Sequence, residues 1–445
     1  MNPRRTARAW LAEVATDFTG LTAPHLPQPP DGPLGWPGYD DQRARAEERT
    51  GEPESVVCGR GRVGGVPVVL LSFEFGYLGG SLGERTGARI EAAHQVARRH
   101  RLPVVSLLAT GGSRMQEGTR ALSQLQLVAR ESARTRRAGL PQLAVLRDPT
   151  TGGGWATLGA GADVVLALSG AQVGFAGSRV RPADADPVAY SAEGQWAAGQ
   201  VDAVLPDREL PEALGRWLRL LTRPSESAPE PPRALSGADL GPPEDGWEAV
   251  TRARSPRRPG ALAYLEDYFD RREEIHGDRS GGVDAGMRCG FGERNGATVA
   301  FAAQCGTATR PAGYRCAARL VRLADRLGVP VLTLVDTPGA ANDARAEREG
   351  AGAALAECFE AMASAEVPMT SLLVGEGGSG GALALCAPGR LWATPDSYFS
   401  VIAPEAAGAI LKLDPGRLRE TADRLRLRPQ DLVELGVAQG VVTPG

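Results

Sequence analysis

The hydrophobic pattern along this chain follows the same order of elements twice. In the first half, residues 61–75 ("GRVGGVPVVLLSFEF") open with a glycine turn and continue as an apolar run typical of a buried strand. Residues 87–102 ("GARIEAAHQVARRHRL") then carry apolar side chains at helical spacing, and residues 103–112 ("PVVSLLATGG") form another short apolar run that ends in glycine. This half is therefore predicted to fold as strand, helix and strand.

The second half repeats this order with a different sequence. A glycine turn and apolar run at 292–306 ("GERNGATVAFAAQCG") precede a helical pattern at 314–328 ("YRCAARLVRLADRLG") and a strand-like run at 329–340 ("VPVLTLVDTPGA"). One further strand-like run follows in each half, at 140–148 and at 367–378. The pattern predicts an α/β fold with two domains, each built from repeated ββα units and related by internal duplication.

Proline and glycine divide the chain into four segments. Residues 21–38 ("LTAPHLPQPPDGPLGWPG") predict a loop or an extended chain, which places an N-terminal arm or helix at residues 1–45. Residues 223–245 ("RPSESAPEPPRALSGADLGPPED") have the composition of a linker. The two predicted domains are therefore 46–222 and 246–445.

Composition gives no sign of a nucleic-acid or membrane partner. The 445 residues carry a net charge of −3, and no apolar run approaches the roughly 20 residues that a membrane span requires. The N-terminal residues lack the apolar stretch of a signal peptide, so we expect a cytoplasmic protein. None of the six cysteines forms a CxxC pair, which predicts reduced thiols in the core and no zinc site.

Two glycine-rich turns at the ends of predicted strands carry the most specific chemistry. One is Gly111-Gly112, and the other is the string "GEGGSGG" at 375–381. At such a turn, N–H groups without side chains in front of them can bind a phosphate or hold the oxygen of an enolate or tetrahedral intermediate. The alternative is a tight turn needed only for close packing, but two matched turns favour a ligand site. No Lys-Ser or Lys-Thr follows "GEGGSGG", so a nucleotide P-loop is not indicated.

Side chains that commonly act as acids, bases or nucleophiles are scarce in the sequence. The four histidines form no HExxH motif, and no Gly-x-Ser-x-Gly elbow is present. A catalytic site in this chain is therefore expected to work mainly through backbone donors, while the substrates supply the acid and base groups.

Longer strings resemble one enzyme family. The first half is similar to the β subunit of bacterial acetyl-CoA carboxylase carboxyltransferase, through "FEFGYLGGSLGERTGARI", "ATGGSRMQEG", "GLPQLAVLRDPTTGG" and "VGFAGSRV". The second half is similar to the α subunit, through "IHGDR", "PAGYRCAARL", "VPVLTLVDTPGA", "GEGGSGGALAL" and "SYFSVIAPEAAGAIL". The resemblance implies a crotonase-like fold in each half. It also implies transfer of a carboxyl group from N-carboxybiotin, on a separate carrier protein, to acetyl-CoA or another acyl-CoA, which forms malonyl-CoA in the acetyl-CoA case and serves fatty acid biosynthesis.

The same resemblance implies roles for particular residues. Gly111-Gly112 would hold the enolate oxygen of the acyl-CoA thioester, and Gly380-Gly381 would hold the urea oxygen of biotin. Loss of CO2 would leave a biotin nitrogen basic enough to take the α-proton of the acyl-CoA. Further positions that the resemblance places near substrate are Gly79, Gly80, Arg114, Arg179, Gly377 and Gly378. For the two arginines, a surface salt bridge remains the alternative role.

The resemblance also implies partners. The chain has no Met-Lys-Met biotin attachment motif and lacks the length of a biotin carboxylase domain, so biotin carboxyl carrier protein and biotin carboxylase are expected as separate proteins. Carboxybiotin and acyl-CoA are then substrates, and no covalently bound cofactor is expected. Because the family's sites form where β-type and α-type domains meet across a dimer, we expect a homodimer.

Three departures from the family's pattern leave the function open. Residues 1–55 lack the four-cysteine zinc ribbon of the usual β subunit. The basic loop before "PAGY" is reduced to "TATR", which leaves Arg310, and "ANDARAEREGAG" replaces the usual string near the expected biotin site. A malonyl-thioester decarboxylase or transcarboxylase of specialised metabolism, and a non-catalytic scaffold of a carboxylase complex, therefore stay open as alternatives.

Overall fold

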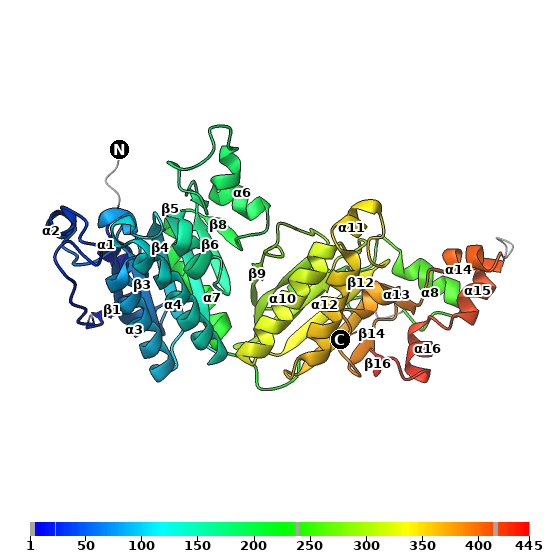
Figure 1. The fold of residues 1–445 in the computed structure, drawn as a ribbon. Coiled ribbons are helices and arrows are strands. Elements are labelled where there is room, and N and C mark those ends of the chain that lie inside the picture. The colour runs from blue at the N-terminus through cyan, green and yellow to red at the C-terminus, as the bar shows by residue number, and fades with distance from the viewer. Residues whose placement is uncertain (1–4, 23, 237–239, 413–416, 445) are drawn as a thin grey trace. The chain divides into compact units, whose positions relative to one another are not determined.

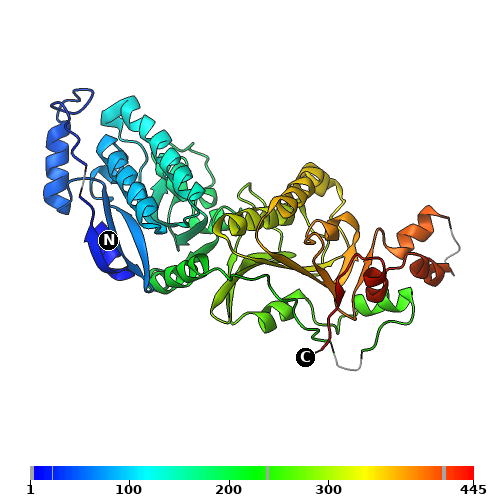
Figure 2. The same cartoon turned by 90° about the horizontal axis from the view of Figure 1, so that it is seen from below.

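Two compact units make up the protein, Met1–Thr222 (unit 1) and Arg223–Gly445 (unit 2). The computed structural model describes residues 5–22, 24–236, 240–412 and 417–444. Within this described part, each unit is built on one mixed sheet with helices packed against it (Figures 1 and 2).

The sheet of unit 1 has the strand order β1-β2-β3-β4-β5-β6-β8, and β7 pairs with the end of β5. The pairs β1–β2 and β2–β3 are antiparallel, whereas the later pairs are parallel. The strands are β1 (Thr16–Gly20), β2 (Val56–Val63), β3 (Val66–Phe73), β4 (Val104–Thr110), β5 (Gln142–Thr151), β6 (Val164–Leu168), β7 (Val173–Gly174) and β8 (Ala203–Leu205). The α-helices are α1 (Ala7–Val14), α2 (Tyr39–Thr50), α3 (Glu84–His100), α4 (Gly118–Arg137), α5 (Gly152–Gly154), α6 (Ala192–Ala197) and α7 (Leu210–Thr222).

The sheet of unit 2 has the order β16-β14-β13-β12-β11-β10-β9, and β15 pairs with the end of β13. Its strands are β9 (Arg271–Ile275), β10 (Met287–Arg294), β11 (Ala297–Gln304), β12 (Val331–Thr337), β13 (Met369–Gly378), β14 (Leu391–Ala393), β15 (Tyr398–Ser400) and β16 (Gly440–Val441). Its helices are α8 (Gly246–Ala253), α9 (Ala261–Tyr268), α10 (Pro311–Leu327), α11 (Ala344–Arg348), α12 (Ala351–Ser364), α13 (Ser379–Leu383), α14 (Pro404–Ile410), α15 (Leu418–Arg424) and α16 (Pro429–Glu434).

The two units share one topology, which confirms the predicted α/β fold and internal duplication. In each, an antiparallel hairpin (β2–β3 or β10–β11) leads through a long helix (α3 or α10) to a parallel strand (β4 or β12). A second long helix (α4 or α12) lies beside the first and precedes the next parallel strand (β5 or β13). The end of that strand then pairs with a short extra strand, β7 or β15.

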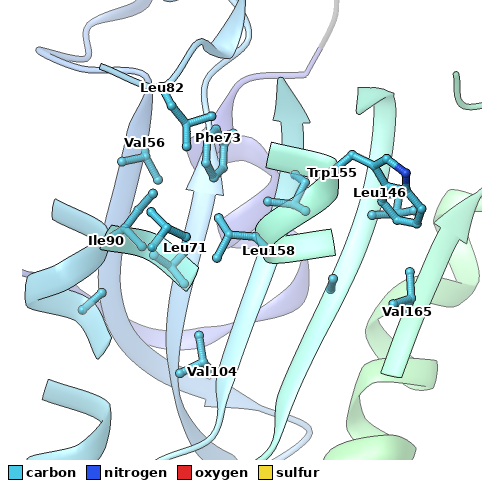
Figure 3. Close-up of a cluster of buried hydrophobic side chains, with 14 of the residues drawn as sticks. Val56, Leu71, Phe73, Leu82, Ile90, Val104, Leu146, Trp155, Leu158 and Val165 are labelled. Atoms are coloured by element: carbon cyan, nitrogen blue, oxygen red, sulfur yellow. The ribbon is translucent and has the colours of Figure 1, made fainter. Parts of the chain in front are cut away.

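Buried aliphatic and aromatic side chains hold helices α3 and α4 on the sheet of unit 1. Figure 3 shows this cluster, in which side chains from the strands pack against side chains from the helices. Because parallel strands are covered by helices, the runs found in the sequence are apolar at nearly every position. The labelled members are Val56, Leu71, Phe73, Leu82, Ile90, Val104, Leu146, Trp155, Leu158 and Val165.

The two segments outside the predicted domains contact the units in which they lie. The N-terminal stretch assigned to residues 1–45 lies within unit 1, where the Ala7 N–H donates to the buried Glu74 carboxylate at 2.7 Å. The segment 223–245 lies within unit 2, where Thr370 Oγ1 donates to Pro229 O at 2.6 Å. Its proline and glycine content thus reflects an extended chain bound to a domain surface.

All six cysteines are free thiols, and five of them are buried, as predicted; Cys305 is half-buried. No helix in the described part of the chain is long and apolar enough to cross a membrane.

Candidate active site

A cleft of about 940 Å³ opens in unit 1 where the parallel strands β4 and β5 end. Carboxyl ends of neighbouring parallel strands meet at one edge of a sheet, so the loops after these strands gather there. The cleft is lined by Arg49, Phe75, Gly76, Leu78, Gly79, Ser81, Gly111, Gly112, Ser113, Met115, Gln116, Pro149, Thr151, Gly152, Gln172, Phe175, Gly177, Ser178, Arg179 and Val180. Among the lining residues only Arg49 and Arg179 are charged, so the cleft is positive and suits an anionic ligand.

The floor of the cleft is backbone. Gly112 and Gly152 have φ values of +106° and +64°, which favour glycine. A Cβ on Gly152 would lie 2.9 Å from Gly112 Cα, so Gly152 cannot carry a side chain without moving the other loop. The two glycines therefore let the loops after β4 and β5 touch.

The predicted donor pair, Gly111-Gly112, has its N–H groups engaged within the protein. The Gly111 N–H donates to Gly79 O at 2.9 Å, and the Gly112 N–H donates to Thr110 Oγ1 at 3.1 Å. Both residues line the cleft, but these hydrogen bonds give their N–H groups a structural partner in place of a substrate oxygen. Gly111-Gly112 thus shapes the wall of the cleft.

Hydrogen bonds show which residues of the two units correspond. The Gly339 N–H donates to Thr337 Oγ1 at 3.1 Å in unit 2, as the Gly112 N–H does to Thr110 Oγ1 in unit 1. Likewise the Thr309 N–H donates to Gly339 O, as the Leu82 N–H does to Gly112 O. Gly112 therefore corresponds to Gly339, and the turn that corresponds to Ser379-Gly380 is Gly152-Gly153.

Gly153 and Gly380 begin short helices after equivalent strands. The residue before each has positive φ, +64° at Gly152 and +56° at Ser379, which turns the chain from strand to helix. N–H groups in a first helical turn have no intrahelical acceptor and carry partial positive charge. In the described part of the chain, no protein acceptor is found for the N–H of Gly153 or Gly380.

Sequence analysis missed Gly153, although a signal was present. "RDPTTGGG" follows the third strand-like run of the first half, as "GEGGSGG" does in the second half. The matching position in the repeat identifies it, whereas the resemblance was taken to imply the glycine pair one strand earlier, Gly111-Gly112.

The neighbouring glycines of the Leu78–Gly80 turn have distinct roles. Gly79, with φ +68°, lines the cleft, and its carbonyl holds the Gly111 N–H. Gly80, with φ +61°, is buried, and a Cβ there would collide with Ala109 O. Only Gly79 of this predicted pair therefore faces the cleft.

Of the two predicted arginines, Arg179 lines the cleft and Arg114 does not. Arg114 is 1% exposed and forms ion pairs with Glu54 at 2.5 Å and Glu117 at 3.2 Å. Burial raises the pKa of the Glu54 carboxyl, but the Arg114 guanidinium more than offsets this and holds that pKa below its ordinary value. Arg114 is thus an internal ion-pair residue, a correction to its predicted place at the substrate.

In unit 2, the turn after β13 shows one open glycine among packed ones. A Cβ on Gly377 would lie 2.5 Å from the Phe399 ring, and one on Gly378 or Gly381 would collide with backbone atoms of the loop after β12. A Cβ on Gly380 would meet no atom within 4 Å. The tight-packing explanation therefore fits three of the predicted glycines, and Gly380 alone faces open space.

Two buried side chains fix the orientation of this turn. Tyr314 Oη and Gln304 Nε2 each donate to Gly381 O at 3.0 Å. Burial raises the pKa of Tyr314 above its ordinary value, so the hydroxyl stays protonated and remains a donor. These bonds hold the peptide between Gly381 and Ala382, directly after the Gly380 turn, in one orientation.

The charged residues beside the turn in unit 2 are paired. Arg310, which remains from the shortened basic loop, lies 3.2 Å from Asp343 and 3.7 Å from Glu349. Asp336 accepts two hydrogen bonds from Arg258, at 2.6 and 2.8 Å, which fits a structural role better than that of a base. No group of three or more His, Cys, Asp or Glu side chains that could hold a metal ion occurs among the described residues.

Family models match both halves of the chain. Residues 38–203 match the carboxyl transferase domain, and residues 244–444 match the acetyl co-enzyme A carboxylase carboxyltransferase-like model. The two matches fall in unit 1 and in unit 2, respectively.

Full-length relatives have the same arrangement. The chain is 39% identical to acetyl-coenzyme A carboxylase carboxyl transferase subunits beta/alpha of Salinispora arenicola, over 99% of this chain and 82% of the relative. It is 38% identical to the protein of that name from Saccharopolyspora erythraea, over 91% of this chain and 74% of the relative. It is 33% identical to a probable biotin-dependent acyl-coenzyme A carboxylase beta3 subunit of Mycobacterium bovis, over 91% and 83%.

Solved structures share the fold. Transcarboxylase 12S, crystallised with methylmalonyl-coenzyme A, matches 99% of this chain and 86% of its own with a TM-score of 0.80 at 21% identity. A single-chain, multi-domain long-chain acyl-CoA carboxylase matches 99% of this chain and 45% of its own with a TM-score of 0.75. The predicted crotonase-like fold and the prediction of a carboxyltransferase are confirmed, and the chain belongs to the acetyl-CoA carboxylase carboxyltransferase family of biotin-dependent enzymes, with a β-like half followed by an α-like half.

Proposed function

We propose that this protein transfers a carboxyl group from N-carboxybiotin, presented on a carrier protein, to acetyl-CoA, forming malonyl-CoA. The observation that carries the proposal is the pair of equivalent strand-to-helix turns, Gly152-Gly153 in unit 1 and Ser379-Gly380 in unit 2. Each turn offers first-turn N–H groups, and the family's reaction develops charge on one oxygen of each substrate.

Unit 1 suits the acyl-CoA. Its cleft of about 940 Å³ is large enough for a cofactor-sized ligand, and its two charged lining residues, Arg49 and Arg179, suit phosphates. The Gly153 N–H, at the floor beside Gly112, would face the thioester oxygen as the enolate forms. The cleft is lined by no Asp, Glu, His or Lys, so the base is expected to come from the substrates.

Unit 2 suits the urea group of biotin. The Gly380 N–H would donate to the urea oxygen, while Tyr314 and Gln304 keep the turn rigid by binding Gly381 O. When CO2 leaves carboxybiotin, the urea nitrogen supplies the base that takes the α-proton of the acyl-CoA. The positions Gly377, Gly378 and Gly381 support this turn through packing.

The test is the reverse reaction of the purified chain. Malonyl-CoA and free biocytin are supplied, and release of acetyl-CoA is followed spectrophotometrically with citrate synthase. Release that requires biocytin supports carboxyl transfer. Release without biocytin would instead establish the decarboxylase alternative, and no release from a folded protein would favour the scaffold.

A second acyl group is kept as a candidate. The Mycobacterium bovis relative is named for acyl-CoA in general, and the floor of the cleft carries no side chain at Gly111, Gly112 or Gly152 that would exclude a longer acyl group. Biocytin-dependent release of propionyl-CoA from methylmalonyl-CoA and of acetyl-CoA from malonyl-CoA, both measured by chromatography, compares the two, since a pocket gains only about 1–3 kcal/mol per methylene.

The proposal also covers the partners, the location and the oligomeric state of the protein. A biotin carboxyl carrier protein and a biotin carboxylase would supply carboxybiotin, and the protein would act in the cytoplasm as a homodimer in fatty acid biosynthesis. Size-exclusion chromatography with light scattering measures the oligomeric state directly.

A further inference from the structure

Helix α2, which crosses the predicted boundary between the N-terminal arm and the first domain, reaches the cleft of unit 1 through one residue. Its last turn carries Arg49, which lines the cleft and donates through Nη2 to Gly76 O at 2.5 Å. The Arg49 side chain is otherwise exposed, so the rest of its guanidinium is directed to solvent and to whatever occupies the cleft. This places a cation at the cleft close to the predicted boundary between the arm (1–45) and the first domain (46–222).

A buried cluster fixes the other end of the helix. Tyr39, at the first position of α2, donates to Glu117 Oε1 at 2.5 Å, and Arg114 Nη1 donates to the same oxygen and to Tyr39 Oη at 3.2 Å each. The three side chains are at most 1% exposed. A phenol, a carboxylate and a guanidinium in one buried site therefore lock the start of α2 to the domain.

The same cluster holds the facing wall of the cleft. Arg114 Nη2 donates to Ser81 O at 2.8 Å, and Ser81 belongs to the turn that includes Gly79. Glu117 Oε2 accepts the Glu84 N–H at 2.6 Å, at the start of α3. One ion-pair cluster thus sets the positions of α2 and of the turn after β3.

We propose that Arg49 binds a phosphate of the CoA moiety, and that Tyr39, Arg114 and Glu117 are positioning residues that hold α2, and through it Arg49, at the cleft. This inference rests on the proposed function, because it assigns the ligand's polyphosphate end to α2. A guanidinium that already donates to one carbonyl is pre-oriented, and its remaining N–H groups match a phosphate.

The experiment measures CoA binding by calorimetry with the full chain. Arg49→Ala is expected to weaken CoA binding about tenfold, the factor that corresponds to 1.4 kcal/mol. Arg45→Ala is the matched control, because Arg45 lies one turn earlier on α2, is exposed and donates to Asp41 O. In the reverse reaction, with the acetyl thioester products measured by chromatography, Arg49→Ala is expected to lower kcat/KM for malonyl-CoA. It is expected to leave kcat/KM for malonyl-pantetheine, which has no nucleotide phosphates, unchanged.

The positioning role is tested by a double-mutant cycle. Tyr39→Phe removes the hydroxyl from Glu117 and is expected to weaken CoA binding severalfold in the wild-type background but not in the Arg49→Ala background. Gln42→Ala, which removes the contact between Gln42 and Gln116 at 2.9 Å, is a second variant on α2 should Tyr39→Phe fail to fold.

The outcomes are distinguishable. Equal losses for Arg49→Ala and Arg45→Ala, equal losses for malonyl-CoA and malonyl-pantetheine, or an additive cycle would each overturn the inference while CoA binding itself stands. A wild-type protein that does not bind CoA would instead overturn the proposed function.

Discussion

Gly380→Pro isolates one backbone donor of unit 2. Gly380 is the second residue of α13, where its N–H has no intrahelical acceptor and where proline fits the first helical turn. A Cβ there meets no atom within 4 Å, so the Cβ side of the ring has room. The substitution removes the N–H and leaves the Tyr314 and Gln304 bonds to Gly381 O in place. Loss of one such donor typically lowers kcat by about 10²–10³, or about 2.7–4 kcal/mol.

The matched control is Gly380→Ala, which keeps the N–H. In the biocytin-dependent release of acetyl-CoA, Gly380→Pro is expected to lose kcat with little change in the KM for malonyl-CoA, whereas Gly380→Ala retains most of its kcat. The melting temperatures of both variants are expected to stay close to that of the wild type. Equal kcat losses in the two folded variants would show that shape, rather than the N–H, is what the site requires.

Three further predictions concern packing, positioning and pH. Gly112→Ala forces a side chain onto φ +106° and places its Cβ 3.5 Å from Gly152 Cα. It is expected to lower the free energy of unfolding in urea by about 1 kcal/mol or more and to reduce activity. Tyr314→Phe removes one of two donors to Gly381 O and is expected to lower kcat severalfold without raising the KM for malonyl-CoA; an unchanged kcat would contradict its positioning role. Burial lowers the pKa of His94 to about 4, so between pH 6.5 and 4 the unfolded chain binds a proton that the folded chain does not. The free energy of unfolding is therefore expected to fall by about 3 kcal/mol as the pH drops from about 6.5 to 4. Thermal melts of His94→Gln should lack this contribution to the pH dependence.

Strand order explains which part of the site the sequence could predict. The apolar runs and glycine turns correctly indicated two equivalent halves, because each buried parallel strand is continuous in sequence. The partner of Gly380 was chosen as Gly112, since both follow short strands ending in glycine, but β4 corresponds to β12 rather than to β13. The hydrogen bonds of the two turns show that Gly153 holds the matching position, which the place of "RDPTTGGG" after the third strand-like run also indicates.

Long-range pairs explain what the sequence could not show. Arg114 follows the first glycine turn directly, which suggested contact with substrate, yet its partner Glu54 lies 60 residues earlier in the chain. Tyr39 lies 78 residues before Glu117, in a segment whose composition indicated a loop and an arm. Neither contact can be recognised from the periodicity of the sequence, because each depends on where the turns after β3 and β4 meet.

The charges at the two turns argue for a division of the substrates between the units. In unit 1 the cleft carries Arg49 and Arg179, and none of its lining residues is acidic. In unit 2, Arg310, which remains from the shortened basic loop, is bound by Asp343 and Glu349. CoA is polyanionic, whereas the urea group of biotin carries no charge. Phosphate binding is therefore needed in unit 1 only. Raising the salt concentration should therefore increase the KM for malonyl-CoA far more than the KM for biocytin, because screening weakens exposed phosphate contacts but not donation from a backbone N–H to a neutral oxygen. Equal increases in both KM values would contradict this division.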